Sequence, residues 1–150
     1  MTRYTDLESM IAAGIVKGKL DPPCVQVMQR ELVEYIPGES LTNAYPVLEM
    51  YSNPRKVMQG GFIAAAFDNT FGTYIYYTVN HLRMATIDLN LSFQNPIFVG
   101  DTLLVKAYIK KFGKTIVHMV GEAFDSKNKI IATSTTNVMI MDERAKVYIK

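Results

Sequence analysis

The stretch from Met58 to Asn80 constrains the fold more than any other part of this chain. It contains the pair Gly60–Gly61 and is then apolar on every side, with Asp68 as its only formal charge. A helix that is apolar all round is buried, either in a protein core or in a bilayer. A carboxylate at mid-span is costly in a bilayer, and the threonines around it weaken that reading further. We therefore expect no membrane span but a long helix, about Gly60 to Thr78, in the core of a folded protein.

Composition and charge exclude several other classes of protein. The chain has 150 residues, 49% of them apolar and 20% charged, so we expect one folded domain over residues 1–150 rather than disorder. The formal net charge is +2 and no basic run exceeds a lysine pair, which argues against nucleic-acid binding. Cys24 is the only cysteine, and the N-terminus lacks the order of a signal peptide. The expected location is the cytoplasm.

The remaining pattern predicts a first helix and an antiparallel sheet. Thr5-Asp6-Leu7-Glu8 has capping-box spacing and predicts a helix from about Asp6 to Lys17. The expected extended segments are Val25–Ile36, Leu41–Tyr51, Thr86–Phe93, Thr102–Lys111, Thr115–Phe124 and Lys129–Met141. In the third of these, Ile87, Leu89, Leu91 and Phe93 alternate with polar residues, as in a half-buried strand. Strands on both sides of one buried helix predict an α+β fold, with the sheet wrapped around the helix.

Two groups on the long helix could carry chemistry. Gly60 and Gly61 leave backbone N–H groups free at the positive end of the helix dipole, which suits an oxyanion, although the spacing alone favours a packing contact or a loop-to-helix bend. Asp68 is expensive on an apolar helix unless it is paired with a cation or hydrogen-bond donor, or is used as a nucleophile or general base.

The spacing of these two groups decides how they could cooperate. Gly60 and Asp68 lie eight residues apart, which is about 12 Å along one helix. No small electrophilic carbon can lie within about 3 Å of both groups. If both act on one bond, they come from two antiparallel copies of the helix, so a catalytic reading requires a symmetric homodimer with two equivalent sites.

The motif resembles that of a known family. Gln59-Gly60-Gly61, then Asp68, then Gly72 is similar to the His-Gly-Gly, Asp, Gly signature of hotdog-fold acyl-CoA thioesterases. The branch it resembles is the phenylacetate-pathway (PaaI-like) branch of the 4-hydroxybenzoyl-CoA thioesterase superfamily. The likeness covers about Asn53 to Met141, and the spacing from Gln59 to Asp68 is its specific part.

The resemblance implies a hotdog fold and hydrolysis of an acyl-CoA thioester to free acid and CoA. It implies Asp68 as the catalytic carboxylate, Gly60 and Gly61 as N–H donors to the carbonyl, and Asn53 and Thr86 as positioning groups. It also implies a CoA site along a dimer interface, made by Phe93, Asn95, Pro96, Lys111, Gly113, Lys114 and Thr115. No metal or redox cofactor is expected, because CoA enters as part of the substrate.

The chain departs from the motif at Gln59, which stands where the family has histidine. An amide donates a hydrogen bond but cannot shuttle a proton near neutral pH. The two histidines present, His81 and His118, match no family position and are interpreted as structural. Thr86 alternates with the apolar side of its strand and so is expected to face away from its own helix.

Several alternatives stay open at this stage. Gln59 motivates a rival hypothesis, a non-catalytic acyl-CoA binder or sensor on the same fold, while a dehydratase or hydratase and a purely structural protein are weaker options. The lysines near Gly113 suit CoA phosphates but also a solvated hairpin tip. Neither the acyl group nor the choice between a dimer and a dimer of dimers follows from the sequence.

Overall fold

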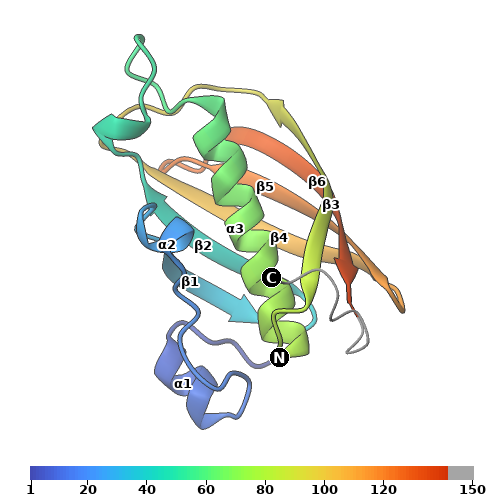
Figure 1. The fold of residues 1–150 in the computed structure, drawn as a ribbon. Coiled ribbons are helices and arrows are strands. Elements are labelled where there is room, and N and C mark those ends of the chain that lie inside the picture. Colours follow the sequence, from blue (N-terminus) through green and yellow to red (C-terminus); the bar gives the residue numbers. More distant parts are fainter. Residues whose placement is uncertain (142–150) are drawn as a thin grey trace.

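In the computed structural model, which describes residues 1–141, one long helix lies across one face of a six-stranded antiparallel sheet (Figure 1). The helices are α1 (Leu7–Ala12), α2 (Pro23–Gln26), the 3₁₀ turn η1 (Glu49–Tyr51) and α3 (Gly60–Val79). The strands are β1 (Glu31–Ile36), β2 (Ser40–Pro46), β3 (Met84–Phe93), β4 (Thr102–Phe112), β5 (Ile116–Phe124) and β6 (Ile130–Ile140). This arrangement confirms the expected α+β class, with the sheet curving around α3.

The strand order explains how the chain encloses its helix. The order across the sheet is β1-β2-β4-β5-β6-β3, so the two strands that flank α3 in sequence lie far apart in the sheet. After α3 the chain returns on β3, which pairs only with β6 among the described residues and forms an edge. The opposite edge, β1, is extended by a bridge between Tyr4 and Tyr35.

The core lies between α3 and the concave face of the sheet. Phe67 and Phe71 of α3 are buried there, with ring centroids 6.0 Å apart. Gly121 of β5 lies directly beneath them: a Cβ at this position would be 2.9 Å from both rings. The absence of a side chain therefore lets the helix approach the sheet closely.

Three local predictions were wrong. Asp6, not Thr5, caps α1, because its carboxylate accepts the Ser9 N–H at 2.7 Å, and the helix ends before Gly14 rather than at Lys17. The short helix α2 occupies the start of the predicted strand Val25–Ile36, since Pro23 at its first position favours a helical start. The long helix is not buried all round, because Asp68 is exposed in this chain.

A β-bulge in β3 overturns the predicted alternation of that strand. Thr86 pairs with Val138 and Asp88 with Asn137, so Ile87 is an extra residue. Ile87 is therefore 49% exposed instead of facing the core. The bulge also places Thr86 on the same face as the residues that point toward α3, contrary to the expectation that it faces away.

Candidate active site

Asp68 is held by a hydrogen bond from the strand beside it. Thr86 Oγ1 on β3 donates to Asp68 Oδ1 on α3 over 2.9 Å. Asp68 belongs to none of the ion pairs among residues 1–141, so no lysine or arginine of that range pairs with it. The second carboxylate oxygen has no donor among the described residues and stays available to a ligand.

A hollow of about 190 Å³ lies beside this carboxylate. We call it the Asp68 hollow. It is lined by Leu20, Pro22, Cys24, Val25, Asp68, Asn69, Gly72, Thr73, Met84, Thr86 and Val138. One wall comes from the segment that leads into α2, the floor from α3, and the other wall from β3 and β6. Asp68 and Thr86 thus provide a polar group at the edge of a mainly apolar space.

The other end of the motif lies at the start of α3. Gln59 is the N-cap, and its side-chain Oε1 accepts the Gly61 N–H at 2.8 Å. Gly61 is therefore not a free donor, which corrects the expectation that both glycine N–H groups are available. The Gly60 N–H has no acceptor among the described residues, so it is the one open donor of the pair.

A second hollow, of about 330 Å³, opens at Gly60. It is lined by Met58, Gly60, Ile63, Phe93, Gln94, Asn95 and Pro96. The Phe93 ring packs over Gly60 so closely that a Cβ there would be 3.0 Å from its Cζ, and Phe93 is still 57% exposed. Asn95 is anchored by donating to the Ile130 carbonyl over 2.8 Å. Three residues of the expected CoA site thus surround the open N–H.

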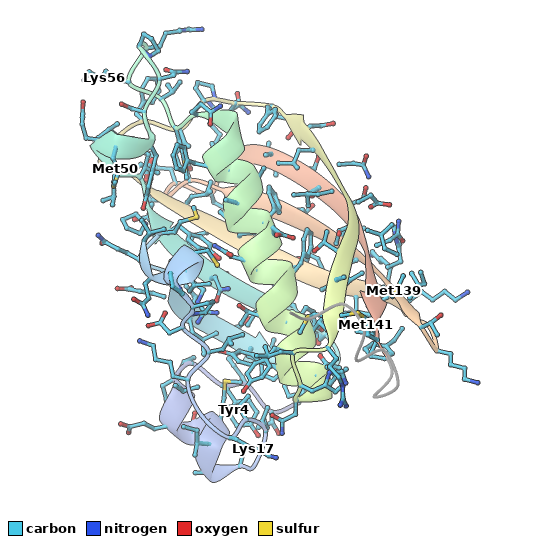
Figure 2. The ribbon with its side chains drawn as sticks, viewed as in Figure 1. Tyr4, Lys17, Met50, Lys56, Met139 and Met141 are labelled. Carbon is cyan, nitrogen blue, oxygen red and sulfur yellow. The ribbon has the colours of Figure 1, made fainter. Side chains whose placement is uncertain are left out.

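The remaining residues expected to contact CoA lie elsewhere in this chain. Phe93 pairs with Ala132 at one end of β6, whereas the Ile140 N–H bonds to the Thr115 carbonyl at the other end. Eight residues of strand correspond to roughly 25 Å. The hairpin that joins β4 to β5 carries these remaining residues and lies beside Met139. Figure 2 shows Met139 far from Lys56, which precedes α3. One chain therefore does not bring Lys111, Gly113, Lys114 and Thr115 to Phe93.

Asn53 serves its own loop. Its Oδ1 accepts the Arg55 N–H at 2.9 Å and the Val57 N–H at 3.4 Å, and its backbone pairs with that of Val57. The side chain closes the loop that leads into Gln59, and it lines neither of the two hollows. Its predicted role near the substrate is not supported by this geometry.

Both histidines have structural partners outside the two hollows. His81 Nδ1 accepts the Arg83 N–H at 3.2 Å, and His118 Nδ1 lies 2.9 Å from Asn137 Oδ1.

Beneath α3, the Tyr45 hydroxyl lies 2.9 Å from Thr70 Oγ1, and burial raises the pKa of Tyr45 to about 12. This phenol stays protonated near neutral pH and does not line the Asp68 hollow, where Asp68 is the carboxylate and Cys24 contributes a thiol.

The wall residues Leu20 and Val25 were missed by the sequence analysis. They precede the resembling region and are separated from Asp68 by more than forty residues, and no periodicity marks them.

No described helix is long and apolar enough to cross a lipid bilayer. Within residues 1–141, no group of three or more metal-binding side chains is gathered in one place.

An antiparallel sheet wrapped around one long helix, with a Gly-Gly pair and an aspartate on that helix, defines a hotdog-fold protein of the PaaI-like type. The chain belongs to the thioesterase superfamily, whose family model matches residues 56–132. Both findings confirm the resemblance seen in the sequence.

Individual relatives agree with this assignment. Human acyl-coenzyme A thioesterase 13 is 26% identical over 85 residues, covering 57% of this chain and 60% of the human protein. The PaaI protein of the E. coli phenylacetic acid degradation operon superimposes with a TM-score of 0.75 at 18% identity, covering 81% of this chain and 86% of its own. A phenylacetic acid degradation-related protein of Ralstonia eutropha JMP134 gives 0.75 at 25% identity, over 87% and 98%. The match to the human relative thus spans less than two thirds of that protein.

Proposed function

We propose that this protein hydrolyses an acyl-CoA thioester to a free acid and CoA, at two equivalent sites formed between the subunits of a homodimer. Family membership and the name of the human relative support the reaction class. The observation that carries the proposal is the Thr86–Asp68 hydrogen bond, because it fixes an available carboxylate at the edge of a hollow.

The register of β3 supports a shared site. Asp68 is level with Thr86, and Gly60 is level with Phe93, whose ring covers it. On β6, Val138 pairs with Thr86 and Ala132 pairs with Phe93. Midway between Val138 and Ala132, Thr135 pairs with Asn90. Suppose that the outer edges of two β3 strands pair antiparallel about a two-fold axis at Asn90. The position of Thr86 along one strand then coincides with the position of Phe93 along the other. Asp68 then lies beside Gly60 of the partner subunit, as the 12 Å spacing requires.

The same pairing joins the two halves of the expected CoA site. In one chain the hairpin around Gly113 and the loop after Phe93 lie at opposite ends of the sheet. An antiparallel copy reverses these ends, so the hairpin of one subunit approaches the loop of the other. Lys111 and Lys114 are exposed on that hairpin and suit the phosphates of CoA as point charges.

In the proposed reaction each group has one role. The Asp68 carboxylate adds to the thioester carbonyl carbon, or removes a proton from a water that does so, and the carbonyl oxygen becomes an oxyanion. The Gly60 N–H of the partner subunit stabilises that oxyanion, and its collapse breaks the C–S bond and releases the CoA thiolate. On the first route the acyl group is then held on Asp68 as a mixed anhydride, which a water molecule hydrolyses to the free acid and the Asp68 carboxylate. On the second route the attacking water has already become part of the acid. Thr86 keeps the carboxylate aimed. Gln59 caps the helix and takes no part in proton transfer, and no step requires a metal or redox cofactor.

Two variants test the shared site by complementation. Asp68→Asn removes the carboxylate, and we expect kcat to fall by about 10²–10⁴-fold with little change in KM. Gly60→Pro removes the N–H, at a first helical position where proline is tolerated, since Gln59 already has φ −68° and ψ 139°. We expect kcat to fall by about 10²–10³-fold. Gly60→Ala keeps the N–H and is the matched control for the added side chain against Phe93.

The two inactive variants are then co-expressed with different affinity tags, and dimers carrying both tags are isolated. Such a heterodimer contains one site with both defects and one intact site, so we expect about half of the wild-type activity per dimer. Heterodimers that remain inactive would show that each site uses groups of one chain. Full turnover by Asp68→Asn would remove the assignment of Asp68.

One observation favours the rival function. Gln59 occupies the position of the motif histidine, so the fold could bind acyl-CoA without hydrolysing it. Calorimetry with a non-hydrolysable thioether analogue, together with a thiol-release assay on the matching acyl-CoA, separates the two functions. Tight binding with no thiol released would establish the binder.

A further inference from the structure

We propose that the Asp68 hollow binds a compact acyl group, about the size of one six-carbon ring or a six-carbon chain. We further propose that Gly72 and Leu20 set the largest acyl group accepted. The inference rests on the proposed function and adds the substrate class to it.

The composition of the walls matches an acyl group attached to a thioester. Leu20, Val25 and Val138 present apolar side chains, and Pro22, Cys24 and Met84 lie beside them in the lining. Apart from the Cys24 thiol, the polar side chains lie on α3 and at Thr86, where the carbonyl carbon has to lie to be reached by the carboxylate. An apolar tail in the hollow thus places its carbonyl beside Asp68.

The volume of the hollow sets how much of that tail one chain encloses. The space is about 190 Å³. An apolar cavity of about 150 Å³ is sufficient to hold benzene. One aromatic ring or about six aliphatic carbons therefore fills this hollow, whereas a sixteen-carbon chain leaves most of its carbons outside.

Gly72 is the position where the helix leaves room for the ligand. It lies one turn after Asp68 on α3, and a Cβ built there meets no atom within 4 Å. Since Gly72 lines the hollow, any side chain placed there projects into that empty space. By contrast, a Cβ at Gly121 meets two aromatic rings, so its glycine is explained by packing alone.

The opposite wall is fixed by an arginine. Arg30 Nη1 donates to Thr73 Oγ1 over 2.5 Å, and its Nη2 donates to the Leu20 carbonyl over 2.9 Å. This guanidinium ties the segment before α2 to α3 and so keeps Leu20 in place over the hollow. Residues 20–25 precede the region matched by the family model, residues 56–132, so the family match does not include this wall.

Reciprocal variants test the assignment. Gly72→Val narrows the hollow and Leu20→Ala widens it, while Gly18→Ala adds one methyl in open space away from the hollow and is the control. For each protein, kcat/KM is measured with acetyl-, hexanoyl-, benzoyl-, decanoyl- and palmitoyl-CoA. Dissociation constants are measured in parallel with the corresponding non-hydrolysable thioethers.

We expect the wild type to prefer hexanoyl- or benzoyl-CoA, and the comparison of these two distinguishes a chain from a ring. Gly72→Val should lose about 10- to 200-fold on both while retaining acetyl-CoA, and Leu20→Ala should gain on decanoyl-CoA. A wild type that prefers palmitoyl-CoA, or a Gly72→Val profile parallel to that of the wild type, would overturn the proposal. If no ester is hydrolysed, the proposed function fails, and the same comparison of dissociation constants still decides the inference.

Discussion

At the scale of single residues, the candidate site depends on which hydrogen bonds are made and which are left open. Thr86 donates to one oxygen of Asp68, and the Gln59 side chain takes up the N–H of Gly61. These contacts leave one carboxylate oxygen and the Gly60 N–H as the groups open to a ligand. The site is therefore defined as much by the groups that the fold satisfies as by those it leaves free.

Replacing Thr86 tests whether its hydroxyl positions the carboxylate. Thr86→Val keeps the shape of the side chain but removes the donor to Asp68, and we expect kcat to fall by roughly tenfold, the usual effect of losing a hydrogen bond to a charged group. Thr86→Ser keeps the hydroxyl and should keep most of the activity. Equal rates for the valine and serine variants in the thiol-release assay would contradict this role.

Asp101 gives a prediction about pH and stability. Hydrogen bonds from the Ser126 side chain and from the Thr102 and Ser126 backbone hold the pKa of Asp101 below its usual value. A carboxylate with a lowered pKa stabilises the fold above its unfolded pKa, about 3.9, and this contribution is lost as the pH falls through the folded pKa.

Asp101→Asn should therefore lower the free energy of unfolding at pH 7 by less than about 1 kcal/mol, because the carboxylate is partly open to solvent and the amide oxygen still accepts hydrogen bonds. The difference from the wild type should shrink below about pH 4 and vanish once the carboxyl is protonated in both states. Urea titrations at several pH values measure this. A difference that stays constant down to pH 2 would show that the charge is irrelevant.

At the scale of elements, the contact between α3 and β5 and the bulge in β3 together position the motif. Gly121 lets α3 lie close to the sheet, and the bulge at Ile87 turns Thr86 toward that helix. A regular β3 would point Thr86 outward, and Asp68 would then have no support from this strand.

Gly121→Ala tests the close approach of helix and sheet. The added Cβ would lie 2.9 Å from the rings of Phe67 and Phe71, so the helix or the rings have to move. We expect the free energy of unfolding to fall by about 1–3 kcal/mol. Gly18→Ala, whose Cβ meets nothing within 4 Å, should change it little in the same urea titration. Equal stability of the two variants would show that α3 is not held by this contact.

At the scale of the whole molecule, the outer edge of β3 is the feature to which residues 1–141 of a single chain supply no partner strand. It exposes Ile87 and Phe93 together with backbone groups that have no partner strand within residues 1–141, which is typical of an edge that pairs with another strand. The proposed dimer covers this edge and completes both sites.

Asn90 lies on the proposed two-fold axis and therefore offers a test of the dimer. Asn90→Lys places two like charges opposite each other and should convert the dimer to an inactive monomer, whereas Asn90→Ser should remain dimeric. Mixing Asn90→Lys with Asn90→Asp should restore a heterodimer and its activity. Sedimentation measures the mass, and an Asn90→Lys protein that stays dimeric and active would place the interface elsewhere.

The sequence alone determined the class of fold and the positions of the motif. The apolar stretch around Asp68 predicted one long helix against the core, and the structure has it at Gly60–Val79 against the expected Gly60–Thr78, although the Asp68 side is exposed. Helix rise alone separated Gly60 from Asp68, and this separation is what motivates the dimer. Both inferences rest on local periodicity, which sequence records directly.

Only the tertiary structure decided which neighbours these residues have. The orientation of Thr86 depends on a β-bulge that is set by pairing with β6. The Gly61 N–H donates to the Gln59 side chain, which depends on the rotamer of that side chain. Leu20 lines the Asp68 hollow because Arg30 donates a hydrogen bond to its carbonyl. Each of these contacts depends on packing between segments distant in the chain or on a single torsion angle. Such contacts leave no period or spacing in the sequence, because their energies arise only once the chain has folded.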